Sequence, residues 1–221
     1  MKLFTEDFNQ FYKDLAANNS RDWFHANKKR YENSVKKPFE NFVSVLMDEI
    51  KKDDEHINTD VKQSIFRINR DVRFSNDKTP YKLHSSAVIS RGGKKDYTVP
   101  GVYVQLGPED VRIYGGIYML DKLLLLKVRE YIASNINEFE KVLNDSDFKK
   151  EFGTLQGEKN KIIPKELKEA GAKQPLIYNK SFYYFNKMNP DNVTKDSFLS
   201  DLMKKYYAGK KMKEFLTRAI F

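Results

Sequence analysis

Residues 64–118 combine a strand-like alternation of apolar residues with short connections, and this combination constrains the fold more than any other feature. Four segments have the pattern of strands, namely residues 65–74, 85–90, 101–106 and 111–117. Turn sequences such as "RGGKKD" and "GPED" separate them. Parallel strands need a crossover of about a dozen or more residues, so the sequence predicts a largely antiparallel sheet.

Helical spacing of apolar residues precedes and follows this region. In residues 4–52 aromatic and aliphatic residues recur every three or four positions, Ser20 can cap a second helix, and Pro38 suits the first turn of a third. Residues 120–152 and 196–221 return to helical spacing. The aromatic segment "IYNKSFYYF" between them can form another strand.

The order of these segments, helices then strands then helices, is typical of an α+β fold. We expect an antiparallel sheet of about four or more strands, covered by N-terminal and C-terminal helices. Because no low-complexity linker interrupts the chain, we expect a single domain over residues 1–221. Within it, residues 1–60 are predicted to be helical, residues 61–119 to form the sheet, and residues 120–221 to be mainly helical.

The composition excludes several classes of protein. Aromatic residues make up 14% of the chain, which favours a packed core over disorder. There is no cysteine, and His25, His56 and His84 show no ligand spacing, so we expect no disulfide, no metal site and no cofactor. Glu6 and Asp7 interrupt the apolar run that a signal peptide needs, and no apolar run can span a bilayer. We therefore expect a cytoplasmic protein without a membrane partner.

The net charge of +9 is unevenly distributed. Residues 1–60 carry a net charge of −2, residues 61–120 carry +5 and residues 121–221 carry +6. A basic protein attracts anionic partners over long range, which favours a small anion or a nucleic acid. The alternative for the C-terminal half is a solvated surface, because its lysines alternate with glutamates, as in "PKELKEAG".

The alternation also predicts that one face of the sheet is polar. In the first predicted strand the apolar face carries one arginine, Arg70, and the other face carries only polar residues. The residues predicted on the polar face of the strands include Arg67, Asn69, Asp71, Arg73, Tyr103, Gln105, Arg112 and Tyr114.

This polar face predicts an anion site. Arg67, Arg73 and Arg112 supply forked donors that match phosphate or carboxylate groups, and Asp71 would orient one of these arginines. Tyr103 would add to the binding surface. The competing hypothesis is an internal charge network that holds parts of the fold together, since charged clusters mark both kinds of site.

Acid–base catalysis at the same cluster is left open. Asp71 is the candidate carboxylate, and Lys78 and Tyr81 are the candidate proton partners that would close over the site from a turn set by Pro80. An aspartate between arginines should have a lowered pKa, which suits an orienting role better than that of an acid. We assign Arg70 and Asp77 structural roles, because a guanidinium that points toward the core must be paired.

The spacing R-x-x-R-D-x-R-F-x-x-D-K-x-x-Y, from Arg67 to Tyr81, resembles the signature of an uncharacterised, mainly bacterial family catalogued as domain of unknown function 2461. The stretches "NNSRDWFHANKKRY", "PGVY" and "GGIYM" are also similar to this family. Leu120 departs from the pattern, in which a proline follows "GGIYM". The resemblance covers most of the chain and weakens after about residue 150.

The resemblance implies residues rather than a reaction, since the family has no assigned activity. It places Trp23 and Asn27 in the motif, and we expect them to form a wall of the site. The leading hypothesis is thus a binding or enzymatic site for a small anionic compound, with phosphorylated compounds among the candidates. The alternative is a module that binds nucleic acid or protein, in which the Arg/Asp motif is structural; the sequence leaves the oligomeric state open.

Overall fold

The computed structural model describes residues 2–57, 59–96 and 98–221. Its contacts divide the chain into two compact units. Unit 1 comprises Met1–Ile89, Tyr103–Arg112 and Lys187–Asp201, and unit 2 comprises Ser90–Val102, Ile113–Asn186 and Leu202–Phe221. We describe each unit by itself, and the expectation of a single domain stays a prediction.

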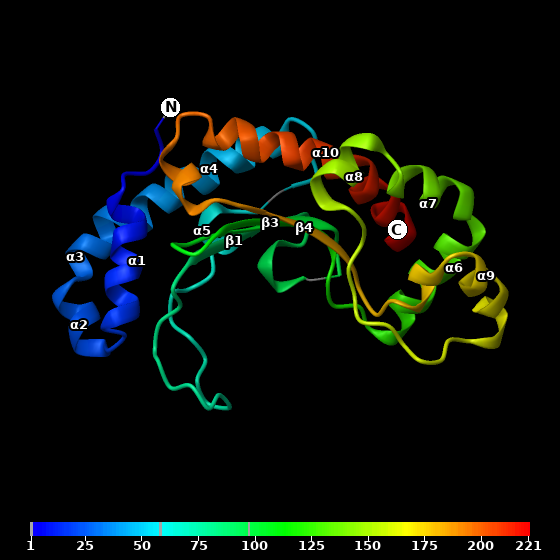
Figure 1. Ribbon diagram of the computed structural model, residues 1–221, viewed down its shortest axis with the longest axis horizontal. Helices are drawn as coiled ribbons and strands as arrows, with labels where there is room; N and C mark the ends of the chain where they lie inside the picture. Colours follow the sequence, from blue (N-terminus) through cyan, green and yellow to red (C-terminus); the bar gives the residue numbers. More distant parts are fainter. Residues whose placement is uncertain (1, 58, 97) are drawn as a thin grey trace. The chain divides into compact units, whose positions relative to one another are not determined.

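The strands form one antiparallel sheet in the order β1-β2-β3-β4, which confirms the predicted α+β class (Figure 1). Its strands are β1 (Ser85–Ile89), β2 (Gly101–Leu106), β3 (Val111–Ile117) and β4 (Phe182–Met188). Burial alternates strictly along β2 and β3, with Val102, Val104 and Leu106 buried and their neighbours partly exposed. The two faces predicted for these strands are therefore confirmed, and β4 arises from the aromatic segment that can form a strand.

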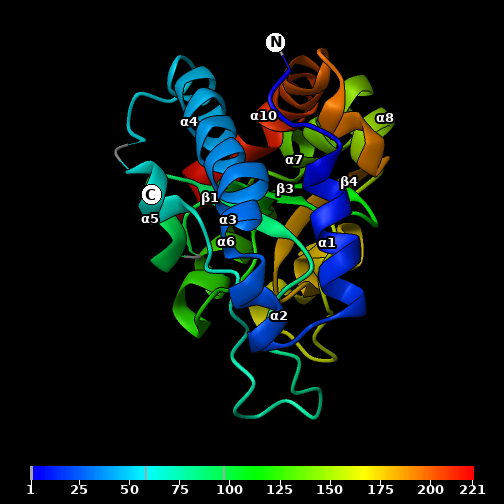
Figure 2. The same cartoon turned by 90° about the vertical axis from the view of Figure 1, so that its left-hand side faces the viewer.

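The predicted strand over residues 65–74 is absent from this sheet. Residues 66–82 instead form an extended arm between α5 (Val61–Ser64) and β1, which Figures 1 and 2 show running out from unit 1 and back. The isolated antiparallel bridge Ile65–Ala87 joins the start of the arm to β1, and the bridge Asn69–Tyr81 pairs the two sides of the arm near its base. A strand with charges on both faces cannot be buried in a sheet without desolvating those charges. This cost explains why residues 66–82 project from the sheet and do not join it.

The helices of unit 1 pack through aromatic side chains. They are α1 (Asp7–Ala17), α2 (Arg21–Ala26), α3 (Lys28–Tyr31), the π-helical turn η1 (Glu32–Lys36) and α4 (Lys37–Lys51). As predicted, Ser20 caps α2 by accepting a hydrogen bond from the Trp23 amide, and Pro38 lies in the first turn of α4. Phe4, Phe8 and Phe42 are almost fully buried, and the Phe42 ring stacks on Phe198 at 5.4 Å.

Unit 2 has a second core. The helices α6 (Lys122–Ser134), α7 (Ile136–Leu143), α8 (Ser146–Phe152), α9 (Lys168–Lys173) and the later part of α10 (Phe198–Ile220) surround it. Phe182 and Tyr184 of β4 enter this core, where the Tyr184 hydroxyl donates a hydrogen bond to the Gly209 carbonyl at 2.9 Å. Among the described residues, no helix is long and apolar enough to cross a membrane.

Candidate functional site

The outer part of the arm, residues 70–79, is a self-contained network of charges. Arg70 donates to the Asp77 carboxylate at 2.5 Å and to the hydroxyl of Thr79, and the Thr79 amide donates to Asp77 at 2.9 Å. These bonds from Thr79 and Arg70 lower the pKa of Asp77 to about 2. Arg70 is thus paired within the arm, whereas the sequence predicted that it points toward the core.

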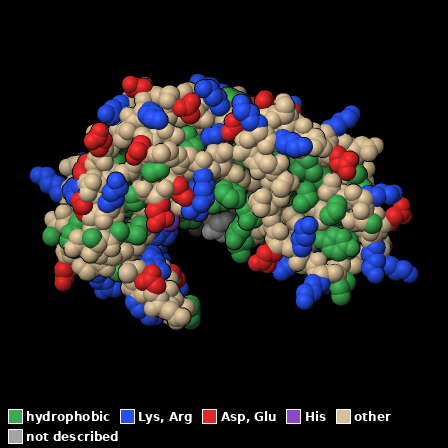
Figure 3. Space-filling view, in the orientation of Figure 1, with side chains coloured by type: hydrophobic (Ala, Val, Ile, Leu, Met, Phe, Trp, Pro, Cys, Tyr) green, Lys and Arg blue, Asp and Glu red, His purple; other side chains and the backbone are tan. Residues whose placement is uncertain are grey.

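Asp71 and Arg73 form a second pair on the outer arm. Arg73 binds the carboxylate through Nε at 3.0 Å and Nη2 at 2.7 Å, which lowers the pKa of Asp71 to about 2. Lys78 donates to the carbonyl of Val72 at 3.0 Å. Phe74 is 95% exposed, and Figure 3 shows charged and apolar side chains mixed along the projecting arm. Asp71 is therefore ionised at neutral pH and is paired with Arg73; that it orients an arginine of a binding site stays a prediction.

The base of the arm is clasped by the segment that connects α1 and α2. Asn19 donates to the Tyr81 carbonyl at 3.0 Å and accepts from the Tyr81 amide at 3.1 Å. The buried Tyr81 ring stacks on Phe24 at 4.1 Å. These contacts join the two motifs that carry the family resemblance. Sequence reasoning missed Asn19 because "NNS" predicts only a helix end and a cap.

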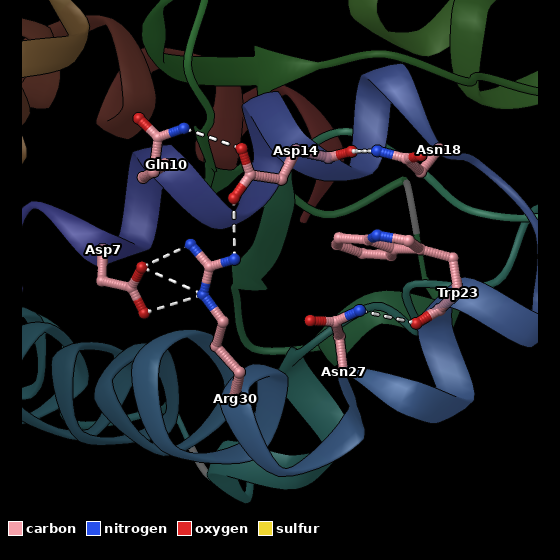
Figure 4. A network of polar contacts seen from close by, with 7 residues as sticks. All are labelled: Asp7, Gln10, Asp14, Asn18, Trp23, Asn27 and Arg30. Atoms are coloured by element: carbon pink, nitrogen blue, oxygen red, sulfur yellow. Dashed lines mark hydrogen bonds and ion pairs between the residues drawn. The ribbon is translucent and has the colours of Figure 1, made fainter.

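Trp23 and Asn27 belong to a network among the helices of unit 1, shown in Figure 4. Asn27 donates to the Trp23 carbonyl at 2.9 Å, and the Trp23 ring lies 5.6 Å from that of Phe11. Arg30 binds Asp7 and Asp14 of α1, and these bonds lower the pKa of both carboxyls. In the part of the chain that the structure describes, no hydrogen bond or ion pair joins Trp23 or Asn27 to Arg67 or Arg73.

Cations also gather where the arm returns to the sheet. The half-buried Lys82 places its Nζ 5.6 Å from the centroid of the Phe66 ring, which lies 6.0 Å from the Tyr103 ring. Burial, together with the positive charge of Arg67, lowers the pKa of Lys82. Within residues 2–57, 59–96 and 98–221, neither Lys82 nor Arg67 forms an ion pair with an acidic side chain.

A second group of charges adjoins Lys82. Arg112 of β3 donates from Nε to both oxygens of Asp110 at 2.8 Å, and Lys187 lies 3.5 Å from the same carboxylate. Burial first, and then the positive charges of Lys82 and Arg112, lower the pKa of His84 to about 4, while the negative charge of Asp110 acts in the opposite direction. Burial alone would raise the pKa of Asp110, yet the bonds and charges of Arg112 and Lys187 lower it.

We call these six residues the basal cluster: Arg67, Lys82, His84, Asp110, Arg112 and Lys187. It holds four cations, one carboxylate and a histidine that is neutral at pH 7. Gly107, in the turn between β2 and β3, allows this close packing, since a Cβ there would lie 2.9 Å from the Leu83 carbonyl oxygen and 3.1 Å from the His84 Cβ.

The structure thus divides the residues that the sequence predicted as one site. Arg67 and Arg112 join the basal cluster, Tyr103 adjoins it, and Asp71, Arg73, Asp77 and Lys78 lie on the outer arm. Among the described residues no hydrogen bond joins Asp71, Lys78 and Tyr81, the three catalytic candidates. No group of acidic or histidine side chains in the described part of the chain is suited to a metal ion.

Comparison with known proteins agrees with the resemblance carried by residues 67–81. The sequence pattern of a family described as "Conserved hypothetical protein (DUF2461)" matches residues 7–215. No curated protein matches the chain.

Proposed function

The chain belongs to this family, whose description names no activity, and we propose from the geometry that the basal cluster binds a small anionic, phosphate-bearing compound. One observation carries the proposal: Lys82 is half-buried and feels the positive charge of Arg67, and neither cation forms an ion pair with a carboxylate in the described part of the chain. A cation that is removed from water without a counter-ion is destabilising, so a bound anion would relieve this penalty.

The chemistry of the cluster suits a phosphate group. Arg67 offers a forked guanidinium and Lys82 a compact ammonium, which together match phosphate oxygens. His84 is neutral at pH 7, so it can donate one hydrogen bond to the ligand without adding charge. Phe66 and Tyr103 give the site an apolar side.

The alternative in which the motif is a structural charge network fits the outer arm. Arg70 with Asp77, and Arg73 with Asp71, already neutralise each other. We therefore leave Arg73 outside the proposed ligand set and assign the outer network to holding the shape of the arm. Because the Asp71 carboxyl is ionised at neutral pH, we propose binding at the basal cluster rather than acid catalysis by Asp71.

The proposal is tested by the melting temperature of the purified protein against a panel of anions. The panel holds inorganic phosphate, pyrophosphate, sugar phosphates, nucleotides and dicarboxylates, each at low and high salt. A ligand that binds the folded state raises the midpoint. We expect at least one phosphorylated compound to raise it at both salt concentrations.

Two matched variants locate the effect. Lys82→Ala removes the half-buried one of the two basal-cluster cations that form no ion pair among the described residues, whereas Lys78→Ala removes an exposed lysine of the outer arm. We expect the ligand-induced shift to disappear in Lys82→Ala and to persist in Lys78→Ala. Equal shifts in both variants, or no shift with any anion in the wild type, would reject the site.

A further inference from the structure

A row of aromatic side chains follows β3 and β4 within unit 2, on the faces of these strands that point away from its core. We call Tyr114, Tyr118, Tyr183 and Phe185 the aromatic strip. Tyr114 stacks on Phe185 at 5.1 Å, Tyr183 lies 6.3 Å from Tyr114, and Tyr118 meets Tyr183 edge-on at 5.5 Å. The alternate residues Phe182 and Tyr184 enter the core, so strand geometry separates the two sets.

The strip is not explained as part of the core. Tyr118 is 64% exposed, and Tyr183 and Phe185 are partly exposed. Neither the Tyr118 nor the Tyr183 hydroxyl has a hydrogen-bond partner among the residues described. Met119, the next residue along the chain, is 57% exposed as well. Contiguous exposed apolar residues of this kind mark binding surfaces.

The charge of unit 2 indicates what kind of partner fits. Unit 2 contains 21 Lys and Arg and 12 Asp and Glu residues, whereas unit 1 contains 19 of each, so unit 2 carries the entire net charge of +9. A basic unit with exposed aromatic rings matches a partner that has both anionic groups and flat rings.

Cations also flank the strip along the chain. Lys122 follows Tyr118 by four residues. Lys159 and Lys161 lie in a segment that pairs with β4 and the residues before it, through the bridges Gln156–Tyr183 and Lys159–Asn179. These three lysines are exposed and form no ion pair within the described residues. Glu158, in the same segment, is paired with Lys180 at 3.1 Å.

We propose that the aromatic strip is a binding surface for single-stranded nucleic acid, with bases stacked on Tyr118 and Tyr183 and phosphates attracted by the neighbouring lysines. Sheet faces with exposed aromatic residues bind RNA in this manner in other folds. A duplex keeps its bases stacked on one another, so only unpaired bases present their faces to the strip.

The test is fluorescence anisotropy of labelled oligo(U) and oligo(dT) with the full chain at low salt. We expect binding that weakens as salt rises, and at least about tenfold weaker binding of a duplex or of an abasic oligonucleotide. Tyr118→Ala and Tyr183→Ala should each weaken binding about tenfold, which is the lower part of the range for loss of one stacked base.

Matched variants separate stacking from general damage. Tyr118→Phe should bind within about twofold of the wild type, since it keeps the ring and loses only the hydroxyl. Tyr207→Ala should also leave binding unchanged; Tyr207 is 50% exposed but lies on α10 beside Tyr206. Because Tyr118 is on the surface, Tyr118→Ala is expected to fold normally, which its melting temperature checks.

Three results would overturn the proposal. They are no binding by the wild type at low salt, equal affinity for the duplex, and equal losses in Tyr118→Ala and Tyr207→Ala. Lys82→Ala, which removes the key cation of the basal cluster, should leave oligonucleotide binding unchanged. Failure of the anion site and failure of the aromatic strip are therefore distinguishable.

Discussion

The two candidate surfaces of this protein differ in character: the basal cluster has an excess of positive charge, and the aromatic strip exposes uncharged rings. The basal cluster of unit 1 contains four cations and one carboxylate, which pairs with Arg112 and Lys187, so the cluster lacks negative charge. The aromatic strip of unit 2 consists of uncharged rings, of which two carry hydroxyls without partners among the described residues. The net charge of a unit does not predict which surface it carries. Unit 1, which is neutral overall, contains the charged basal cluster, and unit 2, which is basic, contains the aromatic strip.

A candidate site is therefore indicated by cations that lack a neighbouring carboxylate, not by the total charge of a unit. On the outer arm the charges are as dense as in the basal cluster, yet Arg70 and Arg73 are each neutralised by an aspartate. Paired surface charges contribute little to stability and leave nothing for a ligand to neutralise.

The largest expected effect concerns the packing beneath the aromatic strip. A Cβ at Gly115 would lie 2.3 Å from the ring of Tyr184, which is held by its bond to Gly209. Gly115→Ala should therefore lower the free energy of unfolding by about 3 kcal/mol, as overpacking of a rigid core does. Urea denaturation measures this.

The control for this prediction is the double variant Gly115→Ala/Tyr184→Leu. Removing the ring relieves the clash, so the double variant should be more stable than the sum of the single losses implies. Strict additivity would show that Tyr184 does not fix the packing of β3 against β4.

The next effect is a pH dependence of stability that arises from His84. Its pKa is about 4 in the folded protein, against an ordinary value near 6.5 in the unfolded chain. Between these values the unfolded chain binds the proton and the folded protein does not, so stability falls as the pH drops from 6.5 to 4. The loss approaches about 3 kcal/mol for a shift of this size.

His84→Gln isolates this effect, because glutamine does not titrate. Urea denaturation at several pH values from 7 to 4 should show a smaller loss of stability in the variant than in the wild type. Asp71 and Asp77 contribute in a separate window below pH 4, since their folded pKa values lie near 2. Parallel pH profiles for the wild type and the variant would contradict the partly buried position of His84 beside cations.

A smaller effect is expected at the clasp of the arm. Asn19→Ala removes both hydrogen bonds to the Tyr81 backbone and leaves its amide and carbonyl without these partners. The free energy of unfolding should fall by about 2 kcal/mol. The neighbouring Asn18→Ala, which loses one exposed bond to the Asp14 carbonyl, should cost less than half as much. If the two variants were equally stable, Asn19 would not anchor the arm.

Much of the sheet was predictable, because the alternation in β2 and β3 reports which side chains face a core. The arm was not, since the same alternation arises whether a segment joins a sheet or pairs only with itself. Arg70 is the one residue that argues against a buried strand, because an arginine on the apolar face is better accommodated in a projecting arm than in a core.

Part of the candidate site could be predicted from the sequence, because the guanidinium donors of Arg67 and Arg112 indicate anion binding. The sequence spacing of His84 fits no metal site and gives no other signal. Asp110 and Lys187 are brought to Arg112 by tertiary structure, which no local pattern contains. Asn19 forms hydrogen bonds with backbone atoms 62 residues away, so no local sequence pattern identifies its partner.

The smallest expected effect is at the tip of the arm, and it sharpens the contrast between the outer network and the basal cluster. Phe74 is 95% exposed, so Phe74→Ser should change the free energy of unfolding by less than about 0.5 kcal/mol. Arg73→Ala should leave the melting temperature unchanged and, unlike Lys82→Ala, should preserve the shift caused by the anion. Loss of that shift in Arg73→Ala would move the site outward, because it would mean that the ligand displaces Asp71 from its bidentate pair.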